Sequence, residues 1–387
     1  MPALVLDHHD TSTVRYVYAT DVIKTRNGKE WRHALMSKPR EFHEFSTVLD
    51  DVEARVLRGQ ILQGITNGTA FSIAVQSEAL AIRSYAGTVL TVATTTLSDW
   101  VANGATVAFD ALNGYQLQTT VASFTATTIT LSATPTANLV GAVIVPMQAL
   151  QFDDAQQFGR WAVNMQRLDA KGEAISPAAL TGAGATLTTH DGLPVFDRGI
   201  SIEDMVAEAL IAMTERIDFG ILQTTSAVRT VSDWARTISY TYNKDSERQW
   251  IKKMFATCKG RQKLFLLPTG TPDLTVHTQP TSTALRIYGP PTAGTTDYTA
   301  QWFQSLAHRR LMIVTTLTVL YRNVVASVDN ADGTQTLTLD SSVSYFVHGN
   351  VTRISLLEQC RFDEDEMRLT YSTSGGKTQL QARVVQQ

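Results

Sequence analysis

The sequence predicts a β-rich α+β fold made of two related copies of a strand-helix-strand core, each with an antiparallel β-sandwich or barrel module. Three observations support this prediction. The chain has 387 residues, which suits two domains of ordinary size. Short runs rich in Thr and Val favour strands, because branched side chains fit a half-buried pleated surface. One order of motifs occurs twice, around Trp31 and Trp234, as expected for an internal duplication.

The duplication is read from four successive motifs. The first series consists of Lys29-Glu30-Trp31-Arg32, the aromatic-rich residues 42–45, a stretch ending at Arg58-Gly59, and the apolar residues 71–75. The second consists of Asp233-Trp234-Ala235-Arg236, the alternating residues 238–242, a stretch ending at Lys259-Gly260, and the apolar residues 264–267. Trp31 and Trp234 are therefore expected near the starts of equivalent cores.

The first copy is expected to begin with strands. Residues 14–18 alternate with the period of a half-buried strand. Asn27-Gly28 predicts a hairpin, because both residues tolerate positive φ. Asp50 and Glu53 have the spacing of a capping box, which predicts a helix beginning here. Gly59 is expected to end that helix in a left-handed conformation.

The remaining segments complete a five-part division. Short strands separated by Gly and Asn-Gly from about residue 84 indicate a β module. The predicted parts are a first ring-forming core (1–83), a β module (84–170), an extended linker or loop (171–198), a second core (199–310) and a second β module (311–387).

The second copy is expected to contain three helices. Ser201 would cap the first, with Met205, Ala209 and Met213 on one face. The second spans about residues 245–259 and presents Trp250, Met254 and Cys258 to the core, because these follow at intervals of four. A third, short helix is expected over residues 299–310.

Composition and charge exclude several classes of protein. The net charge of −3 gives no electrostatic reason to expect nucleic acid or an anionic membrane as the main partner. Cys258 and Cys360 lie far apart, without metal-ligand spacing, and are expected to be buried. We find no secretory leader and no apolar run near the roughly 18 residues of a membrane span. Synthesis in a reducing cytoplasm and no membrane insertion are expected.

No motif predicts catalysis. His8-His9-Asp10 contains ligand types, but adjacent side chains point apart and no partner pair is evident. The acidic run of Asp363, Glu364, Asp365 and Glu366 lacks the spacing of a calcium loop and is expected to be a charged turn. The prediction is a non-enzymatic protein with no catalytic, cofactor-binding or metal-binding residues and no cofactor.

A resemblance gives the functional expectation. Residues 18–22, then Arg26-Asn27-Gly28-Lys29-Glu30-Trp31-Arg32, then Lys38-Pro39-Arg40 resemble tail-tip proteins of tailed bacteriophages, closest to distal tail proteins and baseplate hub components. The resemblance covers about sixty residues, with a fainter echo in the second copy. The duplication departs from single-copy distal tail proteins, which leaves the choice between distal tail and hub component open.

The resemblance implies a structural virion protein at the tail tip. It would form a homo-oligomeric ring, a trimer or a hexamer, that continues the tail tube and contacts the tail tube protein, the tape measure protein and other baseplate or hub proteins. DNA would pass through the lumen without specific binding. Subunit contacts are hypothesised at a set of basic and aromatic residues: Lys24, Arg26, Lys29, Trp31, Arg32, Trp234 and Arg236.

Two alternatives belong to other classes. A carbohydrate- or host-receptor-binding tail accessory would need exposed aromatic platforms, for which Trp100 and Trp161 are the candidates. A cell-wall or polysaccharide hydrolase would need acids, which the run at residues 363–366 and the pair Asp153-Asp154 would supply.

Overall fold

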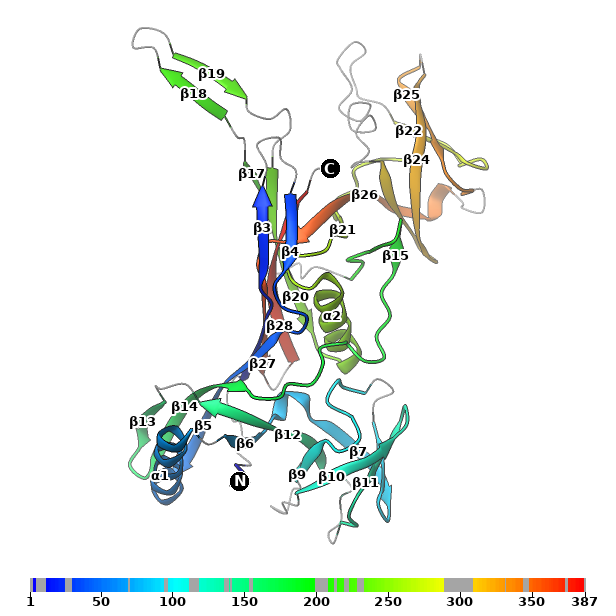
Figure 1. Ribbon diagram of the computed structural model, residues 1–387. Coiled ribbons are helices and arrows are strands. Elements are labelled where there is room, and N and C mark those ends of the chain that lie inside the picture. The colour runs from blue at the N-terminus through cyan, green and yellow to red at the C-terminus, as the bar shows by residue number, and fades with distance from the viewer. Residues whose placement is uncertain are drawn as a thin grey trace.

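The computed structural model (Figure 1) is an elongated, mostly antiparallel β structure with two helices in the part of the chain that it describes. That part comprises residues 3–4, 12–24, 30–68, 70–93, 97–110, 118–135, 139, 141–152, 156–198, 208–211, 214–218, 223–227, 233–288, 309–330, 332–343, 348–372 and 375–385. The predicted β-rich α+β fold is confirmed.

A continuous antiparallel sheet runs through both copies. In spatial order its strands are β13 (Gln157–Ala162), β14 (Met165–Ala174), β5 (Arg40–Asp50), β2 (Ser12–Val17), β27 (Glu366–Ser372), β28 (Gly375–Val384), β20 (Asp233–Tyr242) and β17 (Glu208–Ile211). The first four strands belong to the first copy and the last four to the second. The copies are therefore joined where β2 pairs with β27.

The order of elements is the same in both copies. The first copy contains β2, the hairpin of β3 (Thr20–Lys24) and β4 (Glu30–Ala34), β5, α1 (Asp51–Asn67), β6 (Phe71–Ala74), a barrel, β12 (Val143–Phe152), β13 and β14. The second contains β17, the hairpin of β18 (Thr214–Asp218) and β19 (Gln223–Ala227), β20, α2 (Asp245–Cys258), β21 (Phe265–Pro268), a barrel, β26 (Val351–Phe362), β27 and β28. The two-residue strand β1 (Ala3–Leu4) lies beside β6.

Equivalent contacts confirm the duplication. The pairings of β6 with β12 and of β12 with β14 recur as those of β21 with β26 and of β26 with β28. Phe71 packs on Phe152 with ring centroids 5.1 Å apart, and Phe265 packs on Phe362 at 4.6 Å. These matches show that one fold occurs twice, although few residues are identical.

Each copy carries a small closed barrel between its second core strand and its long return strand. The first barrel has β7 (Leu80–Ala86), β8 (Val89–Val92), β11 (Thr128–Leu131), β10 (Gln118–Phe124), β9 (Thr106–Asp110) and the start of β12, which returns to β7. The second has β22 (Ala284–Tyr288), β25 (Thr334–Leu339), β24 (Val319–Asp329), β23 (Arg310–Thr315) and the start of β26, preceded by the 3₁₀ turn His348–Asn350. Bridges from Leu274 to Ile354 and from Val276 to Ile287 close it.

Each barrel has its own apolar core. The prediction of antiparallel barrel modules is therefore confirmed. The predicted bounds of the modules are wrong, however: β13 and the first part of β14 fall within 84–170, and β27 and β28 fall within 311–387, but all four strands pair in the central sheet.

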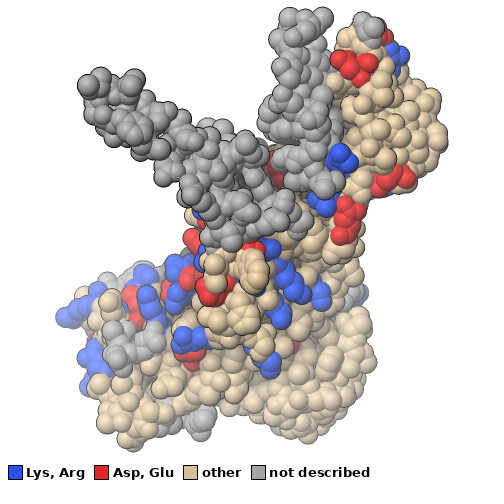
Figure 2. All heavy atoms as spheres, turned by 45° about the horizontal axis from the view of Figure 1, so that its top comes forward, with Lys and Arg blue, Asp and Glu red and all other residues tan. Residues whose placement is uncertain are grey.

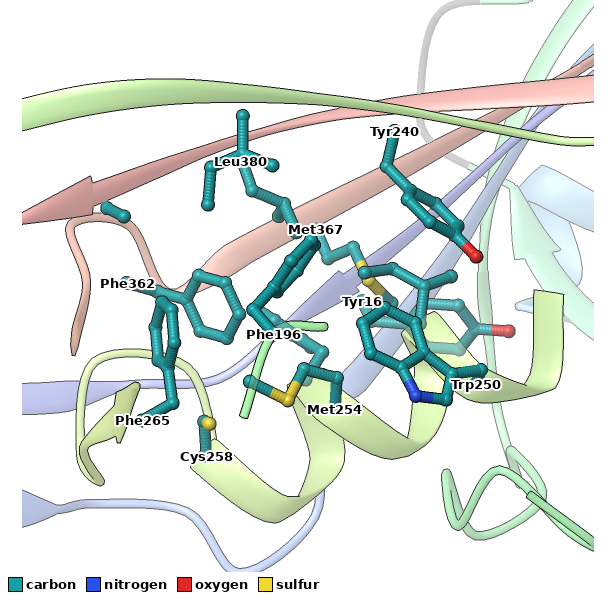
Figure 3. Packing of buried hydrophobic residues seen from close by; sticks show 14 of the residues in the cluster. Tyr16, Phe196, Tyr240, Trp250, Met254, Cys258, Phe265, Phe362, Met367 and Leu380 are labelled. Carbon is teal, nitrogen blue, oxygen red and sulfur yellow. The ribbon is translucent and has the colours of Figure 1, made fainter. Parts of the chain in front are cut away.

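The largest core lies between α2 and the second half of the sheet (Figure 3). Trp250, Met254 and Cys258 point from α2 into this cluster, as predicted from their spacing. Phe196, from the segment between the copies, packs edge-on against Trp250 with centroids 5.0 Å apart. Val14, Tyr16 and Tyr18 enter the same cluster, so the first strand of the first copy completes the core of the second.

The segment between the copies crosses α2. After β14 it runs without long elements, apart from β15 (Thr189–His190) and β16 (Leu193–Pro194). The carboxylate of Asp99, in the first barrel, accepts hydrogen bonds from the backbone of Thr181, Gly182 and Ala183. Residues 171–174 of the predicted linker belong to β14, and the rest of it connects the first barrel to the second copy.

Several local predictions are wrong. Gly59 lies inside α1, whose C-cap is Gly68 with φ of 62°. A strand, β17, occupies Glu208–Ile211 where the helix from Ser201 was expected, and the rest of that predicted helix up to residue 207 lies outside the described residues. Arg310 begins β23 instead of ending a helix, and residues 299–308 lie outside the described part.

Trp31 and Trp234 are not equivalent. Trp31 lies in the hairpin strand β4, whereas Trp234 lies in β20, the counterpart of β5. In the first copy α1 follows β5, and in the second copy α2 follows β20, so β5 and β20 are equivalent strands. The two tryptophan motifs therefore lie in strands that are not equivalent. The expected alignment of the two copies is wrong at this point, because it matches a hairpin strand with the strand that follows a hairpin.

Candidate functional site

Considering the described residues alone, the central sheet has one covered face and one open face. Strand side chains alternate between the two faces. Val14 and Tyr16 of β2, Met367 and Leu369 of β27 and Leu380 of β28 lie on the covered face and are at most 4% exposed. In Figure 1, α2 and both barrels lie on one side of β20, β27 and β28. The other side carries the alternate residues of the same strands.

The open face is polar along most of its width. From the β14 edge to β20 it presents mainly charged and hydroxyl or amide side chains: Arg167, Asp169, Lys171, Glu173, Arg40, Phe42, Glu44, Ser46, Thr13, Arg15, Glu366, Arg368, Thr370, Lys377, Gln379, Gln381, Arg383, Thr237, Ser239 and Thr241. An antiparallel sheet can leave one face in contact with water in this way. The face passes without interruption from one copy into the other.

Cross-strand ion pairs balance much of the positive charge on this face. Arg15 lies at the join between the copies, with its Nε 3.2 Å from Oε1 of Glu44 and its Nη1 3.4 Å from Oε2 of Glu366. Arg40 donates from Nε to Oε1 of Glu173 at 2.6 Å. Hydrogen bonds and charge from Arg40 outweigh partial burial and lower the pKa of Glu173. Neighbouring strands thus present opposite charges.

Two further ion pairs lie on or beside this face, one within β14 and one between β28 and the turn before β27. Nε of Arg167 lies 2.9 Å from Oδ1 of Asp169, and Nη2 of Arg383 lies 2.9 Å from Oδ2 of Asp363. Burial alone would raise the pKa of Asp363, but hydrogen bonds and charge from Arg383 and Arg361 lower it overall. An open face with these pairs lacks a single-sign field that would hold a polyanion tightly. Basic and acidic residues are also interspersed on the side of the molecule that Figure 2 presents.

A shallow hollow lies on the second-copy part of the open face. Its lining includes Thr237, Glu366, Arg368, Lys377 and Gln379. These residues come from three adjacent strands and carry both signs of charge, so the hollow has the mixed character of the whole face. Sequence reasoning did not identify this face, although the alternation of polar and apolar residues in each strand is the signal that defines it.

The hypothesised contact residues fall into two regions. Trp31 is 74% exposed on the β3–β4 hairpin, and Arg32 is half-buried beside it. Arg236 is only 6% exposed and donates from Nη1 to the carbonyls of Pro268 and Thr269 at 3.1 and 2.9 Å. Trp31 is thus available to a partner, whereas Arg236 has an internal role.

The other members of that set are only partly described. Lys24 ends β3 and Trp234 lies in β20 opposite Leu210, but their side chains lie outside the described part. Arg26 and Lys29 lie outside the described residues altogether. The structure thus brings Trp31 and Arg32 together on one hairpin and places Arg236 and Trp234 in a different strand.

The acidic run has structural partners. Oδ2 of Asp365 accepts from the backbone N–H of Thr20 at 2.7 Å, and its Oδ1 accepts from the N–H of Arg261 at 2.9 Å. Asp363 pairs with Arg361 and Arg383. These carboxylates fasten β3 and the end of α2 to the turn before β27. Asp153 and Asp154 lie outside the described residues.

The remaining candidates are buried or undescribed. Cys258 and Cys360 are buried in the same core, as predicted, and burial raises the pKa of both thiols. Trp100 is 9% exposed, and its Nε1 donates to the Glu78 carbonyl at 3.0 Å, so it is not an exposed platform. The side chain of Trp161 and residues 8–10 lie outside the described part.

Metal-ligand clusters and membrane-spanning helices are both absent from the described residues. No group of three or more His, Cys, Asp or Glu side chains there is arranged to hold a metal ion. In the same residues, no helix is both long and apolar enough to cross a membrane. The chain matches no protein-family model and no curated protein sequence.

Proposed function

We propose that this chain is a structural virion protein of a bacteriophage tail tip, a distal tail or hub component that forms a ring continuing the tail tube. The observation that carries the proposal is the continuous sheet, which spans two copies of one fold and leaves a polar face uncovered. The resemblance of residues 18–40 to tail-tip proteins supports it from the sequence. In the ring, the open face would line the channel.

The chemistry of the open face suits passage of DNA. Affinity for a nucleic acid backbone depends on cations that neutralise phosphates and release counterions. Arg15, Arg40 and Arg383 already lie within 3.4 Å of carboxylate oxygens. A wall with paired charges stays hydrated but offers DNA few unpaired cations. It would therefore let the polymer slide without specific binding.

The duplication suits a ring on a six-fold tube. Each chain supplies two similar units, so three chains would present six quasi-equivalent positions. Six chains, with the second unit outside, are the other arrangement that closes. The proposed neighbours are the tail tube protein, the tape measure protein and other baseplate or hub proteins. The barrels and the β18–β19 hairpin, which extend away from the sheet (Figure 1), are the parts available to them.

The test is the mass and shape of the purified chain. Native mass spectrometry should give three or six chains per particle, and negative-stain electron microscopy should show a ring with a central hole. Immunogold labelling of intact virions should mark the end of the tail. Particles that remain single chains at all concentrations, or labels confined to the capsid, would contradict the proposal.

A further inference from the structure

We infer that β13 of one chain pairs with β17 of a second copy of the same chain, in the antiparallel register that β2 and β27 already adopt within each chain. This inference rests on the proposed ring and names the surface that closes it. The pairing between the two copies inside the chain serves as the template for the contact between chains.

The equivalence of the strands follows from their pairings. β2 precedes a hairpin and pairs with the long strand β5; β17 precedes a hairpin and pairs with the corresponding strand β20. β27 precedes and pairs with the last strand β28; β13 precedes and pairs with β14. In the interior, β2 pairs with β27. The matching strands β17 and β13 lie at opposite edges of the sheet, so only another chain can join them.

Neither edge strand has a second neighbour in the described part of the chain. Among the described residues, β13 pairs only with β14, and β17 pairs only with β20. An edge strand presents unpaired N–H and C=O groups, which can bind another strand. A chain with two complementary edges can add copies head to tail until the ring closes.

The side chains at the β13 edge are less covered than their counterparts at the interior joint. Leu369 of β27 is fully buried, because β2 lies beside it and supplies Val14 and Tyr16 to the core. Its equivalent in β13 is Phe158, which is only partly buried. A hollow opens beside it, lined by Asp51, Arg55, Arg58, Phe158, Arg160 and Gln166. The core of the first copy therefore lacks the strand that β2 gives the second.

The neighbouring helix shows the same difference. On α2, Nζ of Lys252 lies 5.5 Å from the ring centroid of Tyr16, so the interior joint fills this space. On α1, the guanidinium of Arg58 lies 4.8 Å from the ring centroid of Phe158 and faces the hollow. A strand from another chain would occupy beside α1 the place that β2 occupies beside α2.

The register follows from matched pairs. Phe45 lies opposite Ala170 in the first copy, and Ile238 lies opposite Leu380 in the second. In this alignment of the two copies, Phe45 of β5 is equivalent to Ile238 of β20, and Ala170 of β14 is equivalent to Leu380 of β28. Gly159 opposite Arg167 then matches Thr370 opposite Lys377.

The same alignment determines which residues of β17 and β2 are equivalent. Glu208 lies opposite Arg236 as Val14 lies opposite His43, so Glu208 is equivalent to Val14. Val14 lies opposite Leu369 and Arg15 opposite Arg368. Between chains, Glu208 therefore lies opposite Phe158, and Ala209 opposite Gln157. The backbone of β17 would then lie beside the hollow that Phe158 lines.

The inference is tested by disulfide cross-linking of the full chain. The double variant Ala209→Cys/Gln157→Cys places thiols at directly opposite positions, which a disulfide can bridge. The control is Ala209→Cys/Arg160→Cys, in which the second thiol lies three residues away and on the other face of β13. The native thiols of Cys258 and Cys360 are buried and do not compete. Mild oxidation and non-reducing gels give the readout, with native mass spectrometry of the reduced protein alongside.

The expected result is a ladder of covalent oligomers for the matched pair, at least tenfold more than for the control, ending at the number of chains in the ring. Rings without preferential cross-linking of the matched pair would overturn the joint and leave the proposed function standing. Single chains only, by mass spectrometry, would overturn both.

A second variant tests the joint without disulfides. Phe158→Asp puts a charge at the edge position whose interior counterpart is buried, and should shift the particles to single chains with unchanged circular dichroism. The control is Thr241→Asp on the exposed open face of β20, which should keep the ring. Intact rings of the Phe158→Asp variant would also overturn the joint.

Discussion

Glu78 and Arg248 form a buried ion pair between the two copies of the fold, with Oε2 of Glu78 3.3 Å from Nη2 of Arg248. Glu78 lies in the short 3₁₀ turn Gln76–Glu78 that leads into the first barrel, and Arg248 lies on α2. Lys252, one turn further along α2, pairs with Oε1 of Glu78. The side chains of all three are at most 9% exposed. The first barrel is therefore fastened to the second copy by charge.

Replacing Glu78 should destabilise the chain strongly. Glu78→Gln removes the charge that offsets two buried cations, and breaking a buried pair in this way costs about 3–5 kcal/mol. Urea unfolding monitored by circular dichroism measures the loss as a lower midpoint. The matched control is Glu173→Gln, which breaks the exposed pair with Arg40 and should cost no more than about 1 kcal/mol. Equal losses in the two variants would show that the junction is not held by charge.

The same carboxylate predicts sensitivity to acid. Burial alone would raise the pKa of Glu78, but the charges of Arg248 and Lys252 lower it overall. A carboxyl group with a lowered folded-state pKa stabilises the fold above its unfolded pKa, about 4.3. That contribution is lost as the pH falls through the folded-state pKa. The difference in stability between the wild-type chain and Glu78→Gln should therefore be constant near neutral pH and shrink below about pH 4.3.

A neighbouring acid acts in the opposite direction. Burial raises the pKa of Asp245, and Arg248 only partly counters this. Its raised pKa destabilises the fold at neutral pH, and the penalty is relieved as the pH falls through that pKa. Because the charge of Glu78 also raises the pKa of Asp245, the test compares Asp245→Asn with Asp245→Asn/Glu78→Gln, by urea midpoints at several pH values. A difference that stays constant down to pH 3 would contradict the assignment to Glu78.

Two glycines of α1 should respond oppositely to alanine. A Cβ on Gly64 would lie 2.0 Å from Cε2 of Phe71, inside the core, whereas a Cβ on Gly59 would meet nothing within 4 Å. Gly64→Ala should destabilise by about 1–3 kcal/mol through overpacking. Gly59→Ala should stabilise by about 0.5–1 kcal/mol, because Ala favours a helix interior. Thermal unfolding of both variants measures the effect, and a stable Gly64→Ala variant would be inconsistent with close contact to Phe71.

Local signals predicted some elements well. Asp50 and Glu53 form the expected capping box: Asp50 accepts from the N–H groups of Val52 and Glu53, and Glu53 accepts from the N–H of Asp50. The stripe of Trp250, Met254 and Cys258 is buried as its spacing indicates. In both cases the signal is the spacing of residues along one helix, which a sequence pattern records directly.

The predictions that failed depend on partners distant in sequence. Residues 208–211 carry a helix-like pattern but pair with β20, because a long strand edge can override local propensity. The motifs around Trp31 and Trp234 resemble each other although the first lies in a hairpin strand and the second in the strand that follows a hairpin. A repeat with few identical residues does not reveal such a shift by one strand. The open face combines strands from residues 12 to 383, so its extent follows from the sheet order and not from any motif.

The β3–β4 hairpin should depend on a buried fork between Arg361 and Glu30. Nε of Arg361 donates to Oε2 of Glu30 at 2.8 Å and its Nη2 donates to Oε1 at 3.2 Å, with both side chains 3% exposed. Lysine keeps the charge but cannot make the bidentate contact. Arg361→Lys should therefore cost about 2 kcal/mol and speed amide exchange in residues 20–24 and 30–34.

The control for this prediction is Arg368→Lys on the open face, where Nε lies 3.6 Å from Oε1 of Glu366 and the arginine side chain is 53% exposed. That change should alter stability by less than about 0.5 kcal/mol. Hydrogen exchange measured by mass spectrometry separates the two effects, since a loss confined to the hairpin appears in its peptides alone. If the hairpin amides exchanged at the wild-type rate in Arg361→Lys, the fork would not hold the hairpin. The position of the hairpin, and with it of Trp31, would then depend on the pairing of β3 with β4 and on the hydrogen bond from Thr20 to Asp365.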